Sequence, residues 1–293
     1  MDYTSDEVSL VVLNYNDSDT VINYIESVKK YEIFQHIIVV DNCSTDNSFN
    51  QLCSLSSSKI DVIRTDYNGG YGYGNNYGIR YVIEKYKSAY ILISNPDVEY
   101  TNETVKKLLS CIKTDDSIGV VAPVMKTTDG EICDYCAWYI PNGWNYVLRS
   151  VPLLNRIVKS TKIGLDEINN NEMCSVGAVA GSLLLVRSSA MDAAGMYDED
   201  IFLYCEENVL GIKMKEAGYT TKLLTKAYFI HHHSVSINKS ISSRIVQTKI
   251  MWESKLIVLK KYYHFNKVSC FFALILSRIS ILLMRIMQIW REN

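Results

Sequence analysis

Short apolar runs that alternate with helical patterns constrain the fold of this chain more than any other feature. The runs Val8–Leu13, His36–Asp41 and Ile60–Thr65 each have the length and composition of a buried strand, and a helical pattern follows each run. Strands that alternate with helices predict parallel strand–helix–strand units. We therefore expect an α/β protein built on a doubly wound sheet, for which 293 residues supply an ample core.

A fourth apolar run, Ala89–Ile93, ends in the sequence Ser94-Asn95-Pro96-Asp97. Ligands bind at the carboxyl ends of strands in open α/β sheets. Pro96 fixes the turn, so that Asp97 would point out of the strand instead of pairing within it. Asp97 is therefore a candidate ligand-binding carboxylate. The alternative is an Asn-Pro-Asp turn that does no more than end the strand.

Further polar residues follow the earlier strands, and the predicted sheet would bring them to the same edge. They are Asn16, Asp41, Ser44, Asp46 and Asn68. This set is rich in acceptors for a base, a ribose and a metal ion. The four glycines from Gly69 to Gly74 would let the backbone approach a ligand closely before the next helix.

Several classes of function are disfavoured by what the sequence lacks. A dinucleotide fingerprint should follow the first strand, whereas these glycines follow the third, and no P-loop lysine motif is present. A net charge of −2 with widely spread Lys and Arg gives no reason to expect nucleic-acid binding. The polar, acidic N-terminus has no signal-peptide core, which indicates a cytoplasmic protein with reduced cysteines, including Cys133 and Cys136.

Two groups of titratable residues lie near the end of this pattern. Glu206 and Glu207 precede a helix predicted over Val209–Ala217, where they could be simple helix-dipole partners or supply a general base for a hydroxyl nucleophile. Three consecutive histidines begin at His231. An imidazole placed beside a carboxylate such as Asp97 would complete a divalent-metal site, and chance surface histidines are the alternative.

Aromatic and basic residues gather between Lys126 and Met173, where the pattern becomes irregular. They are Trp138, Tyr139, Trp144, Tyr146, Arg149, Arg156, Lys159 and Lys162. Such a mixture is typical of an acceptor-binding insert or a membrane-facing surface, with a solvated irregular region as the alternative. One long strand over Val176–Val186 is then predicted to re-enter the core.

In this order, the motifs resemble those of the family 2 nucleotide-sugar glycosyltransferases with the GT-A fold, in particular the rhamnosyl- and galactofuranosyl-like bacterial branch that builds capsules and other surface polysaccharides. The resemblance runs from about Val8 to Ser236. It rests on Val-Val-Leu-Asn-Tyr-Asn16, Val-Asp41-Asn-Cys-Ser-Thr-Asp46, the segment from Asn68 to Gly78, Asn95-Pro96-Asp97 and Phe202-Leu-Tyr-Cys-Glu206-Glu207. It implies a Rossmann-like mixed sheet in a catalytic domain over residues 1–238.

The resemblance also implies roles for single residues. The donor nucleotide would be bound by Asn14, Asn16, Asp41, Ser44, Asp46, Asn68, Gly70, Asn76 and Asn95. Asp97 matches the last acid of the metal-binding Asp-x-Asp motif, and His231, or else His233, matches the histidine of the metal site, so Mn²⁺ or Mg²⁺ would be held beside the donor pyrophosphate. Glu207 matches the general base, with Glu206 as the alternative. Two positions depart from the family pattern, since Asn95 replaces the first acid of the motif and Glu207 replaces an aspartate.

The activity that the resemblance implies is an inverting, non-processive transfer of a hexose or deoxyhexose. The donor would be a UDP- or dTDP-sugar and the acceptor a hydroxyl of a polyprenyl-linked saccharide. A processive synthase is disfavoured because no Gln-x-x-Arg-Trp motif is present. One alternative is a nucleotidyltransferase, although its basic glycine-rich loop near the first strand is missing. The other is a catalytically silent partner of a second transferase.

Residues 239–293 form a helical segment rich in both basic and aliphatic residues. Arg278 interrupts the apolar stretch Val268–Met284 at its middle, where a charge in a bilayer would cost about 2.5–3.5 kcal/mol. Lys267, Arg278 and Arg285 fall on one helical stripe, which is typical of a helix in the membrane interface. We expect peripheral attachment to the cytoplasmic face of the cell membrane. The alternatives are a transmembrane span and a helix packed on the catalytic domain or on a second subunit of a homodimer.

Overall fold

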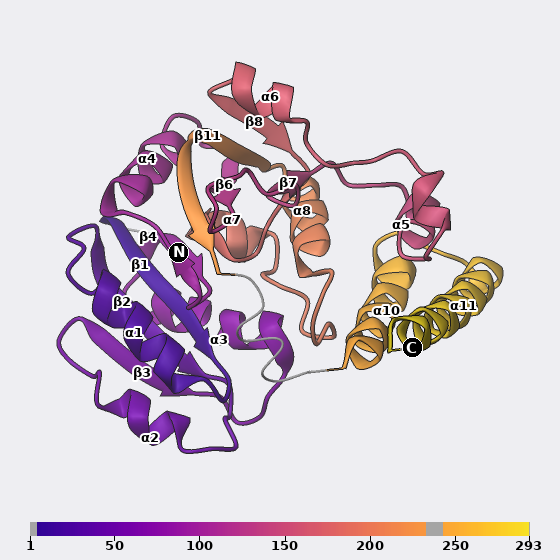
Figure 1. The fold of residues 1–293 in the computed structure, drawn as a ribbon. Coiled ribbons are helices and arrows are strands. Elements are labelled where there is room, and N and C mark those ends of the chain that lie inside the picture. Colours follow the sequence, from indigo (N-terminus) through magenta and orange to yellow (C-terminus); the bar gives the residue numbers. More distant parts are fainter. Residues whose placement is uncertain (1–4, 233–242, 293) are drawn as a thin grey trace.

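The computed structural model describes residues 5–232 and 243–292. Its centre is a nine-stranded sheet with the order β3-β2-β1-β4-β10-β6-β11-β5, to which β8 is added as a partner of β11, and β7 and β9 form a separate pair (Figure 1). The strands are β1 Ser5–Asn14, β2 Phe34–Asp41, β3 Ile60–Arg64, β4 Ser88–Ser94, β5 Val98–Glu99, β6 Ile118–Lys126, β7 Ala137–Trp138, β8 Met173–Val176, β9 Ala178–Val179, β10 Leu183–Arg187 and β11 Thr220–His231. The helices are α1 Ser18–Val28, α2 Ser48–Cys53, α3 Gly70–Lys85, α4 Asn102–Ile112, α5 Gly143–Leu148, the 3₁₀ helix η1 Leu154–Arg156, α6 Leu165–Asn170, α7 Ser188–Ala193, α8 Glu206–Glu216, α10 Arg244–Lys261 and α11 Lys267–Glu292.

The parallel half of the sheet confirms the predicted strand–helix units. The connections through α1 and α2 step from β1 to β2 to β3, and the connection through α3 then returns across β1 to β4. Because such crossovers are right-handed, this reversal puts α3 on the opposite face of the sheet from α1 and α2. The strands are buried on both faces, so they are almost wholly aliphatic. The reversal creates a topological switch point between β1 and β4.

The second half of the sheet is mixed, and here the prediction of one long strand over Val176–Val186 is wrong. The segment is divided between β9 and β10, with β8 ending at Val176, and β10 pairs antiparallel with β4 and β6. Close backbone packing at Gly177 explains the break. A Cβ on Gly177 would lie 2.6 Å from the backbone nitrogen of Ile140, and a Cβ on Gly211 of α8 would lie 1.9 Å from the Gly177 carbonyl oxygen.

The prediction of the helix over Val209–Ala217 started too late. The helix predicted from Val209 begins at Glu206, so both glutamates belong to its first turn. The final strand, β11, extends over Thr220–His231 and pairs parallel with β6. The cysteines are free thiols, and Cys133 and Cys136 are buried near β7.

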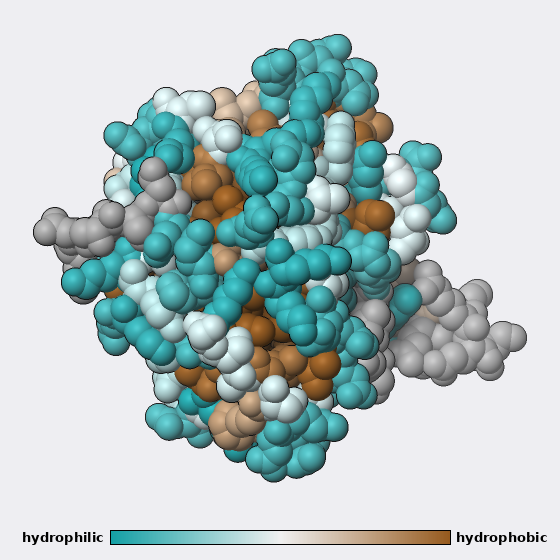
Figure 2. Space-filling view, turned by 90° about the vertical axis from the view of Figure 1, so that its left-hand side faces the viewer, coloured by the Kyte–Doolittle hydropathy of each residue, from teal (hydrophilic) through white to brown (hydrophobic). Residues whose placement is uncertain are grey.

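Two hydrophobic cores stabilise the described chain. The larger core lies on the sheet, while the smaller one joins Trp252 of α10 and Ala273 of α11 to Val147 of α5 and Val209 of α8. Figure 1 shows α10 and α11 side by side next to α5. Figure 2 shows that the side of the molecule on the left of Figure 1 is largely hydrophilic, with hydrophobic residues visible as small patches between polar ones. The smaller core thus attaches the C-terminal helices to elements that flank the Glu206-Glu207 pair.

Candidate active site

The switch point between β1 and β4 opens into a pocket of about 360 Å³. Asn14 ends β1, Asn95 follows β4, and both line this pocket. Asn68 from the loop before α3 and Gly70 at the start of α3 also line it, as does Phe202 from the segment before α8. We call this cavity the donor pocket, because four residues predicted to bind the nucleotide meet there.

The carboxylate of Asp41 is fully buried and holds together the loops that follow β1 and β2. Its Oδ1 accepts a hydrogen bond from Asn14 Nδ2 at 2.8 Å, and its Oδ2 accepts one from the backbone N–H of Ser44 at 3.0 Å. Arg64 Nε lies 3.3 Å from the same Oδ2. Ser44 Oγ in turn accepts hydrogen bonds from Asn14 Nδ2 at 3.1 Å and from the backbone N–H of Asn16 at 2.9 Å. Four of the predicted nucleotide-binding residues therefore belong to one network around the donor pocket.

Two other predicted nucleotide-binding residues hold neighbouring segments of the chain. Asp46 accepts a hydrogen bond from the backbone N–H of Ser48 at 2.9 Å at the start of α2. Asn76 is buried, and its Nδ2 donates to the Tyr197 carbonyl at 3.0 Å and to Glu199 Oε1 at 2.9 Å. The direct contact of Asp46 and Asn76 with a nucleotide stays a prediction, while their observed hydrogen bonds position α2 and the segment before α8.

Gly70 is the point where the donor pocket meets the segment before α8. Its φ of +89° lies in the left-handed region, and a Cβ there would lie 1.9 Å from the Phe202 carbonyl oxygen. The next residue, Tyr71, donates its backbone N–H to that same oxygen at 3.0 Å and its hydroxyl to the Gly181 carbonyl at 2.7 Å. The start of α3 is therefore locked against both the segment before α8 and the segment before β10.

Asp97 and His231 come together because the two-residue strand β5 pairs with the end of β11. His231 lies opposite Val98 in this register, and the backbone N–H of His232 donates to the Asp97 carbonyl at 3.0 Å. This places His231 Nε2 3.3 Å from Asp97 Oδ1, with both side chains largely buried. The Nε2 atom of His232 instead lies 3.0 Å from Glu99 Oε1. His233, the alternative ligand, lies outside the described residues.

The Asp97–His231 pair has a geometry that fits a divalent cation. Two ligands about 2.0–2.1 Å from an octahedral ion, and adjacent on it, lie about 3 Å apart. Asp97 Oδ1 is buried and accepts no hydrogen bond from the described residues, which leaves it able to bind an ion. Among residues 5–232 and 243–292 no group of three or more His, Cys, Asp or Glu side chains forms a metal site. The pair therefore fits an ion that takes its other ligands from a bound phosphate and from water, as Mg²⁺ commonly does.

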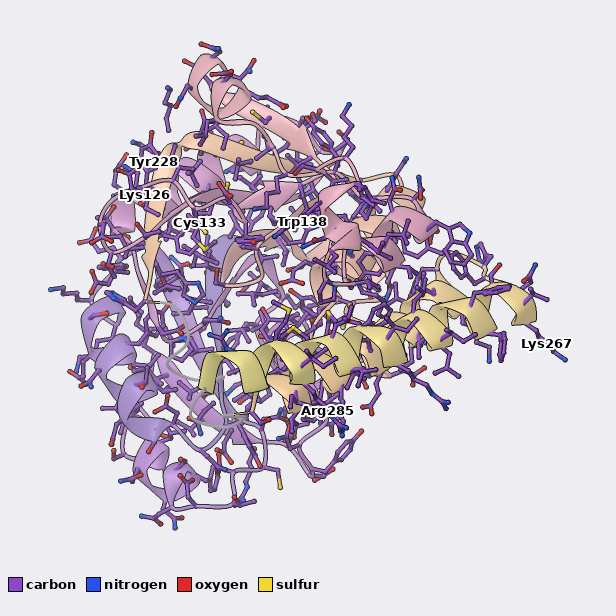
Figure 3. All side chains as sticks on the ribbon, turned by 45° about the vertical axis from the view of Figure 1, so that its right-hand side comes forward. Lys126, Cys133, Trp138, Tyr228, Lys267 and Arg285 are labelled. Carbon is purple, nitrogen blue, oxygen red and sulfur yellow. The ribbon has the colours of Figure 1, made fainter. Side chains whose placement is uncertain are left out.

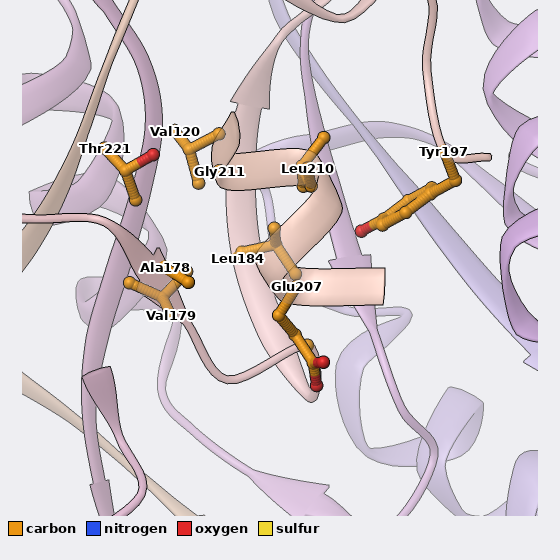
Figure 4. Close-up of a pocket in the computed structure, with 10 residues that line it drawn as sticks. Val120, Ala178, Val179, Leu184, Tyr197, Glu207, Leu210, Gly211 and Thr221 are labelled. Atoms are coloured by element: carbon orange, nitrogen blue, oxygen red, sulfur yellow. The ribbon is translucent and has the colours of Figure 1, made fainter. Parts of the chain in front are cut away.

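The glutamate pair opens α8 after two strained residues. Tyr204 and Cys205 both have left-handed φ angles, of 69° and 75°, and each such residue costs about 1–3 kcal/mol. Glu206 is buried, and its Oε1 has no hydrogen-bond partner among the described residues. Glu207 borders a small internal cavity, and its carboxylate points away from the aliphatic side chain of Leu184 (Figure 4). The strained turn thus presents the two neighbouring carboxylates to different surroundings.

Burial raises the pKa of both glutamates. For Glu206 the pKa is raised well above its usual value, first by burial and then by the nearby Glu207 charge. For Glu207 burial also raises the pKa, while backbone hydrogen bonds at Glu207 and Gly181 offset part of the rise. Burial therefore favours the protonated form of both neighbouring carboxyls. Buried acids with raised pKa values are typical of acid–base sites.

Glu207 also lines a second pocket, of about 460 Å³, which we call the acceptor pocket. Trp138 and Tyr146 contribute aromatic walls, and Arg149 contributes a cation. These residues come from the irregular segment over Lys126–Met173, for which an acceptor-binding insert, a membrane-facing surface and a solvated region were the predicted alternatives. Lys255 of α10 lines the pocket as well. Sequence reasoning missed Lys255, because nothing in a helix with several lysines marks the one that turns inward.

Comparison with known proteins agrees with this geometry. Residues 9–138 match Glycosyl transferase family 2. These residues therefore form a family 2 glycosyltransferase domain. Together with the relatives described next, this domain supports a glycosyltransferase and disfavours the nucleotidyltransferase alternative.

Two relatives of this family 2 glycosyltransferase are rhamnosyltransferases. It is 26% identical over 219 residues to the N-acetylglucosaminyl-diphospho-decaprenol L-rhamnosyltransferase of Mycobacterium tuberculosis, over 71% of this chain and 70% of the relative. It is 24% identical over 242 residues to rhamnosyltransferase WbbL of Escherichia coli K12, over 81% of this chain and 87% of the relative.

Solved structures confirm the GT-A fold for this family 2 glycosyltransferase. GalNAc-T7 with UDP, GalNAc and Mn²⁺ superposes with a TM-score of 0.63 at 14% identity, over 88% of this chain and 49% of that one. The Pyrobaculum calidifontis mannosyltransferase PcManGT with GDP-Man and Mn²⁺ gives 0.60 at 12% identity, over 96% of this chain and 71% of that one.

Proposed function

We propose that this glycosyltransferase moves a sugar, with inversion, from a nucleoside-diphosphate donor to a hydroxyl of a lipid-linked saccharide during synthesis of a capsule or another cell-surface polysaccharide. One observation carries the proposal. The donor pocket is lined on the β4 side by Asn95 and Pro96, next to Asp97, and on the α8 side by Phe202 and Leu203, close in sequence to Glu207. A donor in this pocket would therefore have the metal pair near its diphosphate and the α8 turn near its sugar.

On the donor side, the loops after β1 and β2 would hold the nucleoside of a UDP- or dTDP-sugar through the network around Asp41. Asp97 and His231 would hold Mn²⁺ or Mg²⁺. When bound, such an ion stabilises the negative charge that develops on the leaving diphosphate. Asn95 leaves the pair with one carboxylate fewer than the usual motif, so the donor phosphates would contribute a larger share of the ligands.

On the acceptor side, Glu207 would act as the general base. It lines the acceptor pocket, where the acceptor hydroxyl would donate its proton to the Glu207 carboxylate as its oxygen attacks the anomeric carbon. Attack from the side opposite the leaving nucleotide inverts the configuration at that carbon. Trp138 and Tyr146 offer aromatic faces against which a sugar ring can pack.

The lipid-linked acceptor is supported by the name of the Mycobacterium tuberculosis relative and by the surface of α11. Lys267–Met287 is long and apolar enough to cross a membrane, and only 17% of an apolar stretch of 18 residues within it is buried in the protein. Figure 3 shows α11 along the outside of the molecule, with Lys267 and Arg285 near its two ends. Ala273, Ser277 and Ser280 form its buried stripe.

The exposed side of α11 is divided into two stripes. Phe271, Ile275 and Leu282 are exposed on one stripe, and the cations at positions 267, 278 and 285 form the other. A helix that packs on the protein with one face and exposes an apolar face beside a cationic one fits the membrane interface. We infer that residues 239–293 form a membrane-associating segment that places residues 1–238 on the cytoplasmic face of the membrane.

Nucleotide binding measured by calorimetry tests the proposed function. UDP, dTDP, GDP and CDP would be titrated into the purified protein with and without Mn²⁺, and into Asp97→Ala. The proposal predicts that one nucleotide binds in a Mn²⁺-dependent manner and that Asp97→Ala loses this dependence. Absence of binding by all four would favour the catalytically silent partner instead.

A further inference from the structure

Lys255 is a buried cation that the proposed chemistry does not use. It lies on α10, and only 4% of its surface is exposed. Its ammonium donates hydrogen bonds to the Tyr146 carbonyl at 3.0 Å and to the Ser150 hydroxyl, and it lies 3.6 Å from the centre of the Tyr146 ring. Two of its three protons are therefore engaged by neutral groups.

No carboxylate of residues 5–232 or 243–292 forms an ion pair with Lys255. An ammonium withdrawn from water without an anionic partner is costly, and proteins compensate by pairing it or by lowering its pKa. Burial lowers the pKa of Lys255 to about 8, a shift that the nearby Cys205 thiol partly opposes and to which Arg149 adds. Such a side chain is more often found at a functional site than in an ordinary core.

The acceptor pocket offers space in which an anion could lie beside Lys255. Its charged lining residues are Lys255, Arg149 and Lys162 against the single carboxylate of Glu207. Lys162 is already paired with Asp134 at 2.9 Å, whereas within residues 5–232 and 243–292 Arg149 donates a hydrogen bond to the carbonyl of Lys159, at 3.1 Å, and forms no ion pair. Lys255 and Arg149 thus leave this end of the pocket with uncompensated positive charge.

The position of these cations relates the pocket to α11. Ser280 of α11 donates its hydroxyl to the Ser150 carbonyl at 2.9 Å, and Ser150 is also the partner of Lys255. The cationic end of the acceptor pocket is therefore joined directly to the helix that we expect at the membrane surface. In a saccharide that is linked to a lipid through a phosphate, the negative charge lies between the sugar and the lipid. Such a charge would therefore lie between the acceptor pocket and the membrane surface.

We propose that Lys255, with Arg149, binds the diphosphate of a polyprenyl-diphosphate-linked acceptor, so that the C-terminal helices contribute to acceptor recognition as well as to membrane attachment. This inference rests on the proposed function. Lys255 and Arg149 are positioned to contact the acceptor diphosphate, while Glu207 would contact the acceptor hydroxyl in the same pocket. The neutral bonds to Tyr146 and Ser150 hold the ammonium in place for this contact.

Binding of farnesyl diphosphate to the full-length protein tests the inference without requiring transfer. The titration is made in EDTA, which removes the ion that a diphosphate needs at Asp97, and farnesol serves as the uncharged reference. We expect farnesyl diphosphate to bind more tightly than farnesol. The substitution Lys255→Met should weaken the binding of farnesyl diphosphate by about 10- to 100-fold, which is the range for the loss of a hydrogen bond to a charged group. Lys260→Met, an exposed lysine on the same helix, should leave the affinity unchanged.

A second variant covers the case in which Lys255→Met does not fold. Arg149 is only half-buried, so the Arg149→Gln variant should fold. It should bind farnesyl diphosphate more weakly while its affinity for farnesol stays unchanged. Equal affinity for farnesyl diphosphate and farnesol, or affinity that is unchanged in both variants, would overturn the inference. So would loss of binding in Asp97→Ala alone, because it would place the diphosphate in the donor pocket. The proposed function has a different contradicting result, which is that none of the four nucleotides binds. The two experiments therefore distinguish a failure of this inference from a failure of the proposed function.

Discussion

Asp97 Oδ1 and His231 Nε2 lie 3.3 Å apart, although the two residues are 134 positions apart in the sequence (231 − 97). The antiparallel pairing of β5 with β11 produces this contact. Its register also separates His231 from His232, since His232 lies beside Glu99 instead. The two histidines therefore form a matched pair for testing the metal site.

His231→Ala should weaken Mn²⁺-dependent nucleotide binding, whereas His232→Ala should leave it close to normal. Loss of one of two protein ligands should reduce metal affinity by at least the 10- to 100-fold seen when outer-shell partners are removed. Calorimetric titration of Mn²⁺ in the presence of the bound nucleotide measures the difference. Equal losses in both variants would show that the pair at 3.3 Å is not the metal site.

Gly70→Ala should destabilise the donor pocket. The substitution forces an alanine into a left-handed backbone and brings its Cβ to 1.9 Å from the Phe202 carbonyl oxygen, so the segment before α8 must move. We expect a loss of stability on the order of 1–3 kcal/mol and weaker nucleotide binding, measured by thermal melting with and without nucleotide. Gly164→Ala is the control, because its φ is −76° and its Cβ would meet open space.

Much of this site could be predicted from the sequence, for a physical reason. Parallel strands bring their carboxyl ends to one edge, so Asn68, which lines the donor pocket, could be placed at this edge from the strand pattern. The assignment of Asn14 and Asn95 to the nucleotide came from the resemblance to the family. The separation of His231 from His232 depends on the register of β5, a two-residue strand that leaves no periodic signal. The inward direction of Lys255 depends on how α10 packs on α5, which is a tertiary contact without a local pattern.

Glu206→Gln should change how stability depends on pH. The folded-state pKa of Glu206 is raised above the usual value of 4.5, so the folded state binds more protons and stability falls as pH rises from about 4.5 through the folded-state pKa. Glutamine resembles the protonated side chain. The variant should therefore match the wild type near pH 4 and be more stable at pH 8, as measured by thermal melting at both values. A loss of equal size at both pH values would contradict this prediction.

Membrane attachment should depend on the exposed apolar stripe of α11. Phe271 and Leu282 are 59% and 56% exposed, so Phe271→Glu with Leu282→Glu should leave the fold intact and release the protein from vesicles that contain anionic lipid. Flotation of the vesicles measures the bound fraction. Val246→Glu with Leu165→Glu adds the same charge at exposed apolar positions on other helices and should not release the protein. Persistent binding of the α11 variant would place the attachment elsewhere.

The most direct test of the account compares turnover of Glu207→Gln with that of Glu206→Gln, using sugar donors that carry the nucleotide that calorimetry identifies. Both substitutions keep size and remove a titrating carboxyl from the same turn of α8. The account predicts that Glu207→Gln loses about 10²–10⁴ in turnover while still binding nucleotide, and that Glu206→Gln retains most of its activity. Near-normal turnover of Glu207→Gln, or a loss confined to Glu206→Gln, would contradict the assignment of Glu207 as the base.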